Sequence, residues 1–496
     1  MDSENRKYLS RRDFVKVAGL GLGATAMLAG LNPASVMARV PKKWDQEFDI
    51  IAVGAGGAGL AAAVDASAAG RSFLVLEKMP VIGGSSLICG GALAFAGTDM
   101  QKEQNIKDSN ELLYKDIMKV GDNVNVPSLV KAYVDNQLDT YYWLKKMGIK
   151  FIKIGIASGM SVPRAHYVSP PQVIKTLSDK AKSMGTRIMV DSPVTRLIAD
   201  DNGDIRGVIV ERKGKKMNYG ARRGVILTSG GFSLNKKLLA KFVPPMAFAQ
   251  ALVGPGSNGD GLKMAWAYGS DIEDMPYIKA TFGFAPNPKS ISTDFALVFY
   301  AGAIIVNKEG KRFVNESKSY KLVGDAALVQ PDAIGFQIYD SAIREAALKD
   351  PLNRIIDLEK QNRIYSAPTL GELARKLNIP AQNLEETVRD YNANVEKGID
   401  PQFGRTTLVA SFGKPVKIYK PPFYGFPSTA VILGTYGGIL IDDKTRVVDI
   451  FGNAIPRLYA AGEVIGGFHG AAYMTGTAFG KALVFGRIAA RSLTGK

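Results

Sequence analysis

The sequence predicts an α/β fold, and three observations support this prediction. The 496-residue chain has an ordinary globular composition, with 46% hydrophobic and 22% charged residues, so it can bury a large core. Residues 48–77 follow the order strand, glycine-rich turn, helix, strand. Strand-like and helix-like segments then alternate along the rest of the chain. At roughly 150 residues per domain, this length is typical of two or three domains.

Residues 1–38 have the features of an export signal. The stretch SRRDFVK (10–16) is followed by a weakly apolar, Gly- and Ala-rich segment and then by a small-residue cleavage site ending at Ala38. The alternative is a basic N-terminal helix, but the glycines make this segment a poor helix and a poor membrane span alike. We therefore predict a twin-arginine signal and a periplasmic or extracytoplasmic protein. Because this route carries proteins that fold in the cytoplasm, export already suggests a bound cofactor.

The rest of the composition disfavours several function classes. One cysteine, Cys89, and two histidines, His166 and His469, are too few for a metal site or a haem attachment motif, so we expect no metal. The net charge of +17 favours acidic partners, but the lysines are dispersed and no nucleic-acid-binding motif is present. We expect no nucleic acid partner. After residue 38 no apolar run is long enough for a membrane helix, so we do not expect an integral membrane protein.

The glycine-rich turn after the first strand predicts a dinucleotide site. Residues 48–53 form a short apolar strand, and the sequence GAGGAG (54–59) follows at once. The turn holds the three glycines that such a site requires for a tight turn, for close approach of a diphosphate and for helix packing: Gly54, Gly56 and Gly59. The next strand ends at Glu77, where a carboxylate can accept a hydrogen bond from a ribose hydroxyl. The diphosphate would then meet the N-terminal end of the helix.

A second Gly- and Ser-rich path indicates which dinucleotide binds. Residues 81–86, 90–92 and 97–99 offer backbone amides that could follow an extended cofactor, and nicotinamide dehydrogenases do not need such a path. No second G-x-G-x-x-G motif follows a strand elsewhere, so a dedicated NAD(P)H domain is absent. Electrons must therefore arrive or leave by another route.

At this point the sequence resembles the flavoprotein family that contains fumarate reductase, succinate dehydrogenase, urocanate reductase and the 3-ketosteroid dehydrogenases. The resemblance continues through TSGGF (228–232), GDG (259–261), GAIIVNKEGKRFVNE (302–316), TYGGIL (435–440) and YAAGE (459–463). It implies a Rossmann-like FAD-binding domain interrupted by a mixed α+β capping domain. The implied FAD-binding domain covers residues 45–275 and 404–496, with a helical region at 106–185, and the implied cap covers residues 276–403.

The same resemblance implies that FAD is the cofactor. The residues implied to bind it are Gly54, Gly56, Gly59, Glu77, Lys78, Gly84, Ser85, Ser86, Gly90, Gly91, Asp99, Val194, Gly230, Asp260, Glu463, Thr477 and Ala478. Some family members carry a histidine near the segment that corresponds to Ser85–Ser86, and this histidine links covalently to the flavin. This chain has none there, so we expect the FAD to be non-covalent.

The substrate site departs from that of the fumarate reductases, which hold a dicarboxylate with Arg and His and deliver a proton from an Arg. Here Tyr320 stands at the position of the proton-delivering Arg, Tyr473 at that of a carboxylate-binding Arg, and Gly434 at that of a carboxylate-binding His. The Glu and Arg of the proton relay are replaced by Ala296 and Phe299. A buried carboxylate without its guanidinium partner is strongly unfavourable, so we reject fumarate as the substrate.

Aromatic residues lie near the same motifs and indicate a less polar, carbonyl-bearing substrate, although each could instead be core packing: Phe282, Phe284, Phe295, Phe299, Tyr300, Tyr436 and Phe468. Tyr320 and Tyr473 are similar to the substrate-contacting tyrosines of the 3-ketosteroid dehydrogenase branch. Our hypothesis is that Tyr473 polarises the substrate carbonyl and Tyr320 exchanges the proton. Lys318 and Lys321 would lower the pKa of Tyr320 if they turn inward. His166 and His469 are expected to be structural or flavin-shell residues.

The sequence therefore predicts an exported FAD-dependent oxidoreductase that acts on a carbon–carbon bond next to a carbonyl. The favoured interpretation is an ene reductase that receives electrons from a separate cytochrome. One alternative is a 3-ketosteroid-type dehydrogenase, Δ1 or Δ4, that passes electrons to a quinone-linked acceptor. Another is a flavin electron-transfer subunit whose chemistry lies in its partner.

Overall fold

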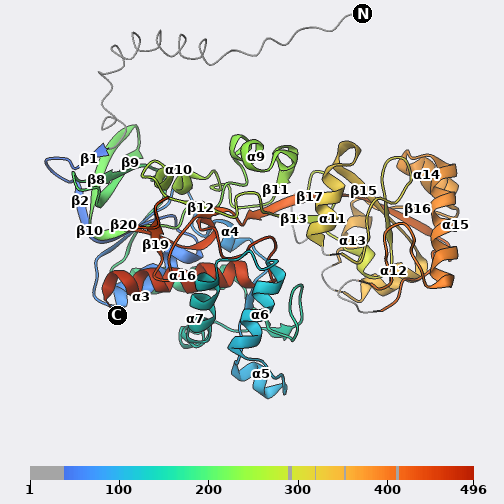
Figure 1. Cartoon of the computed structure of the whole chain (residues 1–496), viewed down its shortest axis with the longest axis horizontal. Coiled ribbons are helices and arrows are strands. Elements are labelled where there is room, and N and C mark those ends of the chain that lie inside the picture. The colour runs from blue at the N-terminus through green and yellow to red at the C-terminus, as the bar shows by residue number, and fades with distance from the viewer. Residues whose placement is uncertain (1–37, 289–292, 319, 351–352, 409–412, 496) are drawn as a thin grey trace, which may run out of the picture.

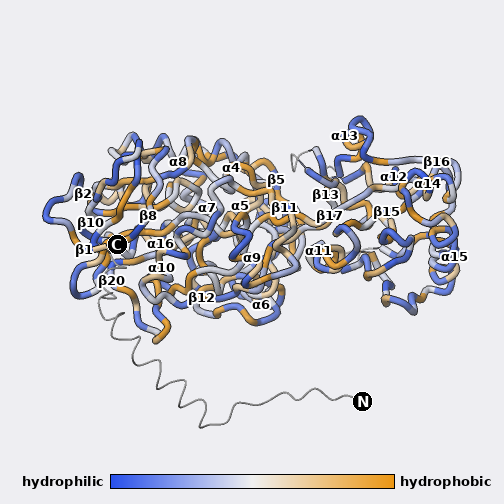
Figure 2. Tube along the Cα trace, turned by 90° about the horizontal axis from the view of Figure 1, so that it is seen from above, coloured by the Kyte–Doolittle hydropathy of each residue, from blue (hydrophilic) through white to orange (hydrophobic). Residues whose placement is uncertain are grey.

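The structure is a computed structural model, and it describes residues 38–288, 293–318, 320–350, 353–408 and 413–495. These residues form two lobes joined by a narrow waist (Figures 1 and 2). The expected export signal lies outside the described residues, apart from Ala38. Within the described residues, no helix combines the length and the apolar character needed to cross a membrane.

The larger lobe is built on a sheet that contains nine strands within the described part of the chain. Its main order is β1 (Ala38–Arg39), β8 (Val194–Ala199), β9 (Ile205–Arg212), β10 (Lys215–Leu227), β2 (Gln46–Val53), β3 (Phe73–Leu76) and β7 (Arg187–Met189); β20 (Ala454–Ala460) pairs with β10, and β19 (Arg446–Val448) pairs with β20. The pairs β10–β2, β2–β3, β3–β7 and β10–β20 are parallel, so the carboxyl ends of these strands meet at one edge.

The central strand β2 is covered on both faces, which explains its uninterrupted apolar run. Ile50 and Ala52 belong to one buried core, and Ile51 and Val53 belong to the other. Helices α3 (Gly57–Ala68) and α16 (Thr477–Thr494) lie side by side under the sheet (Figure 1). A Cβ on Gly486 would lie 2.3 Å from the Ala58 carbonyl oxygen, so this contact of α16 with α3 requires glycine.

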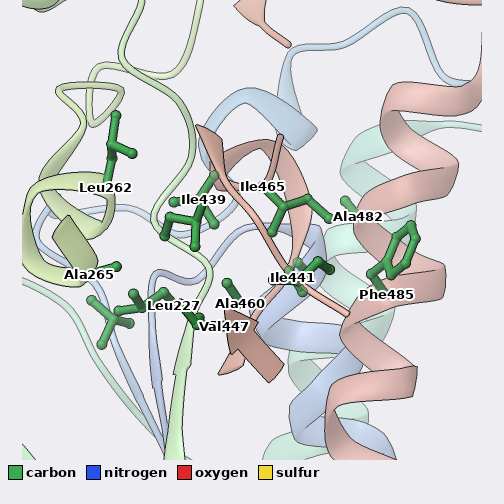
Figure 3. Packing of buried hydrophobic residues seen from close by; sticks show 14 of the residues in the cluster. Leu227, Leu262, Ala265, Ile439, Ile441, Val447, Ala460, Ile465, Ala482 and Phe485 are labelled. Atoms are coloured by element: carbon green, nitrogen blue, oxygen red, sulfur yellow. The ribbon is translucent and has the colours of Figure 1, made fainter. Parts of the chain in front are cut away.

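The second face of the sheet is closed by segments that are far apart in the sequence. Figure 3 shows Leu227 and Ala460, which lie at strand ends, in one buried cluster with Ile439, Ile465 and Phe485 of α16. Other elements of the lobe are α9 (Lys236–Phe242), η2 (Pro244–Phe248), α10 (Asp260–Trp266), η6 (Gly462–Val464) and the antiparallel pair of β12 (Ile272–Glu273) with β18 (Gly438–Ile439). This packing holds the loops after the strands in place around one site.

Residues 84–185, which include the region 106–185 that the sequence predicted to be helical, carry helices and one small sheet. The helices are α4 (Gly84–Leu87), α5 (Asp99–Glu103), α6 (Asn110–Val120), α7 (Pro127–Lys146) and α8 (Pro170–Ser183), and the sheet consists of β4 (Ala92–Ala94), β6 (Ala165–Tyr167) and β5 (Lys153–Gly155). Both α7 and α8 begin with proline, which fits the first turn of a helix. Buried Arg164 pairs with Asp108 and Asp116 and ties this region together.

The smaller lobe has its own mixed sheet and its own core. The sheet order is β11 (Gln250–Ala251), β17 (Phe423–Thr435), β15 (Ile334–Asp340) and β14 (Ile304–Val306), and β13 (Ile278–Phe284) and β16 (Tyr365–Ala367) both pair with β17. The helices are η3 (Val298–Tyr300), α11 (Tyr320–Leu328), η4 (Pro331–Ala333), α12 (Ser341–Leu348), α13 (Ile355–Lys360), α14 (Leu370–Leu377) and α15 (Ala381–Lys397). Buried Arg312 bonds Glu316 and Asp400, which fixes the loops below this sheet.

The antiparallel strands β13 and β17 lie at the waist between the lobes (Figure 1). Strand β17 is central to the smaller lobe's sheet, although its residues come from the segment assigned to the FAD-binding domain by sequence. Where the FAD-binding domain ends and the cap begins stays a prediction. Lys279, near the start of β13, is paired with Gly434, near the end of β17. These two residues lie where the waist meets the larger lobe.

Candidate active site

A cavity, partly open to solvent, lies at the carboxyl ends of the parallel strands. It begins at the ends of β2, β3 and β10 and extends to the waist, where residues 433–436 of the β17 end and Lys279 of β13 line it. Ligands of open α/β sheets bind at such an edge. The position of the cavity therefore agrees with a cofactor in the larger lobe and a reacting centre near the waist.

The glycine-rich turn has the shape of a diphosphate cradle. Gly54 has a φ of +119°, and a Cβ there would lie 2.4 Å from the Thr228 carbonyl oxygen, so glycine is required. A Cβ on Gly56 would meet no protein atom closer than 3.9 Å, so it would protrude into the space in front of helix α3. That space is part of the cavity and lies at a helix N-terminus, which suits an anionic diphosphate.

Glu77 lies at the end of β3, as the dinucleotide pattern predicts. Its carboxylate accepts hydrogen bonds from the backbone N–H groups of Ala55 and Met79, each at 2.9 Å. A carboxylate has further lone pairs, so Glu77 can also accept a bond from a ribose hydroxyl. Lys78 forms a 2.5 Å ion pair with Asp260; burial disfavours the charged form of Asp260, but Lys78 lowers its pKa overall. This pair closes one side of the cavity.

The structure brings most of the predicted cofactor residues to this one cavity. Those that line it are Gly54, Gly56, Glu77, Lys78, Gly84, Ser85, Ser86, Val194, Gly230, Asp260, Glu463 and Ala478. Ser85 and Ser86 also hold the walls together, since their hydroxyls accept hydrogen bonds from the backbone N–H groups of Gly254 and Gly57.

Five of the predicted cofactor residues lie outside the lining: Gly59, Gly90, Gly91, Asp99 and Thr477. For Asp99 the structure gives a different role, because its carboxylate is bound by Tyr141 and Lys145 at 2.5 Å each. Gly59 and Gly91 instead permit close backbone contacts, with Gly54 and Val168 respectively. The hydroxyl of Thr477 donates to the Met474 carbonyl.

The two predicted catalytic tyrosines meet near the waist. Tyr320 begins α11 of the smaller lobe, and Tyr473 lies in the loop before α16 of the larger lobe. Their hydroxyls hydrogen-bond to one another, and both interact with the Thr475 hydroxyl. The ring of Tyr473 also lies 6.1 Å from the ring of Tyr436, which lines the cavity. Residues from both lobes therefore contribute to one polar cluster.

Both phenols are protonated at neutral pH. Burial raises the pKa of Tyr320 well above its ordinary value, and burial raises the pKa of Tyr473 to about 12. The expectation that Lys318 and Lys321 would lower the pKa of Tyr320, if they turned inward, was wrong in its outcome, because this pKa is raised. Lys318 is exposed, and the side chain of Lys321 lies outside the described part. The lysine that opposes the shift is Lys279, which comes from β13.

Three buried ionisable groups surround the cavity near α16. Burial raises the pKa of Glu463, whose carboxylate accepts a 3.0 Å hydrogen bond from the Thr435 N–H. Burial lowers the pKa of Lys481 to about 8, and its ammonium donates to the Ile465 carbonyl at 3.1 Å. Burial and the nearby lysines lower the pKa of His469 well below its ordinary value, so its imidazole is neutral.

The aromatic residues near the motifs mostly serve the core. Of the seven named from sequence, only Tyr436 lines the cavity. Phe282 and Phe299 pack with their ring centroids 6.0 Å apart inside the smaller lobe, and Phe468 is buried in the larger one. Phe284 and Phe295 pack against one another, and Tyr300 packs against Phe299. Core packing, the alternative given for each ring from the sequence, therefore holds for most of them.

Sequence reasoning missed several lining residues. Gly254, Gly256 and Ser257 form a Gly-rich segment whose composition could have marked it as a backbone wall. Lys481 is flanked by apolar residues in the first half of α16, which is also a detectable signal. Lys279 gave no such signal, because its position depends on the pairing of β13 with β17.

This fold and this site define a flavoprotein oxidoreductase. The chain belongs to the family of the FAD binding domain, whose sequence model matches residues 49–478, and thus to the fumarate reductase and succinate dehydrogenase flavoproteins. It is an FAD-dependent oxidoreductase that acts on CH–CH groups. The cradle around Gly56 and the lining described above fit FAD.

Three comparisons support this assignment. The chain is 34% identical over 449 residues to a fumarate reductase (cytochrome) of Shewanella frigidimarina, covering 89% of this chain and 76% of that protein. The open conformation of a flavocytochrome c3 fumarate reductase superposes with a TM-score of 0.79 at 28% identity, covering 100% of this chain and 82% of that one. The 3-ketosteroid-Δ4-(5α)-dehydrogenase of Rhodococcus jostii RHA1 gives 0.75 at 25% identity, with 92% and 99% covered. The predicted family and fold class are confirmed.

Proposed function

We propose that this protein is an exported ene reductase that reduces a carbon–carbon double bond next to a carbonyl or carboxyl group. It uses non-covalent FAD and takes electrons from a separate cytochrome. The observation that carries the proposal is the pair of protonated phenols, Tyr320 and Tyr473, which lie outside the cavity lining but next to it, with the Tyr473 ring 6.1 Å from that of the lining residue Tyr436. Reduction of an activated double bond requires a proton donor and a hydrogen-bond donor for the carbonyl oxygen, and these two groups can supply both.

The residues of the larger lobe would hold FAD as follows. Backbone N–H groups at the start of α3 face the diphosphate, and Glu77 faces a ribose. The bound flavin supplies hydride chemistry. The residues around Ser85 and Ser86 support non-covalent attachment. The two serine hydroxyls accept hydrogen bonds from backbone amides, and this segment of the sequence contains no histidine.

The chain's own residues then have separate tasks. Tyr473 donates a hydrogen bond to the substrate carbonyl oxygen, which stabilises the negative charge that develops there. Tyr320 donates the proton to the α carbon. Because the Tyr320 hydroxyl also bonds Tyr473 and Thr475, it can recover a proton through this network. The half-buried positions of both tyrosines limit competing access of water.

A cytochrome partner is supported by three features. The relative from Shewanella frigidimarina is named a fumarate reductase (cytochrome). This chain has one cysteine and no haem attachment motif, so its haem would belong to another protein. The net charge of +17 suits docking of an acidic redox protein. The twin-arginine signal predicted at residues 1–38 would place the reaction outside the cytoplasm, where such cytochromes can dock.

The 3-ketosteroid dehydrogenase is the second candidate, because that structure superposes over most of this chain. Dehydrogenation requires a base that removes a proton from carbon. Burial raises the pKa of Tyr320 well above its ordinary value, so little phenolate is present at neutral pH. This favours the reductive direction.

The experiment is anaerobic oxidation of reduced methyl viologen by the purified, FAD-loaded protein. The panel runs from fumarate and urocanate through cinnamates to cyclic enones and 3-ketosteroids. We expect turnover of conjugated acids or enones and none of fumarate. If the protein turns over no compound of the panel but transfers electrons to a cytochrome, it is an electron-transfer subunit instead. Oxidation of a saturated ketosteroid with an artificial acceptor would support the dehydrogenase.

A further inference from the structure

Lys279 is a charged residue of the cavity to which the proposed chemistry assigns no role. It lies near the start of β13, where an otherwise apolar strand leaves the larger lobe. Its side chain is half-buried and lines the cavity beside residues 434–436. A lysine at such a place must find a negative or polar partner, because a buried ammonium without one is unfavourable.

The space around Lys279 exists because residue 434 is glycine. Lys279 and Gly434 are opposite each other in the β13–β17 ladder. A Cβ on Gly434 would lie 3.2 Å from a Glu463 carboxylate oxygen and 4.0 Å from Cδ of Lys279. Any larger side chain at residue 434 would therefore compete with Lys279 and Glu463 for the same volume. The absence of a side chain at Gly434 therefore leaves the volume that the Lys279 side chain borders.

The ammonium of Lys279 lies beside the proposed catalytic tyrosines. Its Nζ atom is 4.0 Å from the centre of the Tyr473 ring, which is a close cation–π contact. The charge of Lys279 also opposes the rise that burial causes in the pKa of Tyr320, so it lies within electrostatic reach of that hydroxyl. One cation therefore borders three of the positions at which the sequence departs from the fumarate reductases, 320, 434 and 473.

Lys279 differs from the other cations of the lining, Lys78 and Lys481. Lys78 is paired with Asp260, and Lys481 donates to the Ile465 carbonyl. Among the described residues, the Lys279 ammonium takes part in no ion pair and no side-chain hydrogen bond, and its close contact is with the Tyr473 ring. Burial lowers the pKa of Lys279, and the carboxyl group that opposes this shift, Glu463, is bonded by the Thr435 N–H. The charge of Lys279 is thus left for a ligand.

We propose that Lys279 binds the carboxylate of the substrate, which makes the substrate a 2-enoic acid with a single carboxylate. This inference rests on the proposed ene reductase function and names its substrate class. The Lys279 ammonium contacts one oxygen of this carboxylate, and the Tyr473 hydroxyl donates a hydrogen bond to the other. Within the described lining no second cation stands without a partner, so a dicarboxylate would leave one charge uncompensated.

The carboxylate is also where charge develops during reduction. A hydride adds to the β carbon, the π electron pair of the double bond moves to the α carbon, and the negative charge spreads onto the carboxylate oxygens. Tyr320 then gives its proton to the α carbon, which completes the saturated acid. The two electrons would come with the hydride from the reduced FAD, to which the proposed cytochrome partner would return electrons. The charge of Lys279 therefore stabilises both the bound acid and the state that follows hydride addition.

The test compares a charged and a neutral substrate of the same shape, cinnamate and its methyl ester. Lys279→Met removes the charge and keeps much of the side-chain volume, Lys279→Arg keeps the charge, and Lys318→Met removes an exposed lysine as a control. We expect kcat/KM for cinnamate to fall roughly 30-fold or more in Lys279→Met, because a hydrogen bond to a charged group is lost. The ester should change less than about threefold, and Lys279→Arg should recover part of the loss.

Binding is measured separately by titrating the saturated acid, hydrocinnamate, into the oxidised protein and following heat or the flavin spectrum. The Kd should rise in Lys279→Met by a factor similar to that of kcat/KM. Equal losses for acid and ester, or an unchanged Kd, would overturn the assignment of Lys279. If the wild-type protein reduces the ester but no enoate, this inference fails and the proposed function stands. If it reduces neither these compounds nor any other enone, the proposed function fails as well.

Discussion

The substitution Tyr320→Phe tests the assignment of the proton donor. It removes one hydroxyl group and keeps the ring at the start of α11. General acid catalysis by a positioned side chain contributes roughly 100-fold to 10,000-fold, so kcat should fall at least about 100-fold. The lost hydrogen bond to Tyr473 should cost only about 1 kcal/mol of folding free energy.

The assay is anaerobic oxidation of reduced methyl viologen with the best substrate of the panel. FAD content, measured by absorbance after denaturation, should be unchanged, because Tyr320 lies outside the lining of the cofactor cavity. Tyr339→Phe is the matched control, since it removes a buried phenol hydroxyl of the smaller lobe that has no hydrogen-bond partner in the structure. If Tyr320→Phe turned over at a near-normal rate while Tyr339→Phe did the same, Tyr320 would not be the donor.

Three further predictions concern the site and its support. Tyr473→Phe should lower kcat/KM for carbonyl substrates roughly tenfold or more, because one hydrogen bond to the oxygen is lost; an effect on KM for viologen alone would contradict this. Gly54→Ala should abolish FAD retention, because its Cβ would lie 2.4 Å from a carbonyl oxygen. Gly90→Ala should retain FAD, because no atom lies within 4 Å of its Cβ. Equal FAD content in the two variants would refute the role of the glycine turn in binding FAD. Burial raises the pKa of Asp274 to about 6, so its folded form holds a proton that the unfolded chain releases near pH 4, and stability should fall as pH rises from about 4 to about 6. In Asp274→Asn, the free energy of unfolding measured with urea should no longer fall between pH 4.5 and pH 7.5. If it falls as much as in the wild-type protein, another group is responsible.

The cofactor half of the site could be predicted from sequence because its pattern is local. The strand, the glycine turn and Glu77 lie within thirty residues of one another, and the backbone geometry of this unit places them together. Tyr320 and Tyr473 could be predicted as a pair only through the resemblance, since they lie on different lobes. The structure supplies what the resemblance lacks, which is their direct hydrogen bond.

The remaining features depend on contacts between distant segments. Lys279 could not be placed in the site from sequence, because its position depends on the register of β13 against β17 and on the absence of a side chain at Gly434. Asp99 was assigned to the cofactor through the family resemblance, but helix α7 supplies Tyr141 and Lys145 to its carboxylate. Phe282 of β13 and Phe299 of η3 lie near the site motifs in sequence, but both side chains are buried in the core of the smaller lobe.

The most direct test of the account is a single-turnover experiment. The FAD of the protein is reduced with dithionite under anaerobic conditions, the excess reductant is removed, and the protein is mixed with cinnamate in a stopped-flow instrument. The account predicts that the flavin absorbance returns and that one saturated acid forms per FAD, with both slowed strongly in Tyr320→Phe. If no conjugated acid or enone reoxidised the flavin, while fumarate or a cytochrome did, the proposed reaction and its tyrosine site would be contradicted.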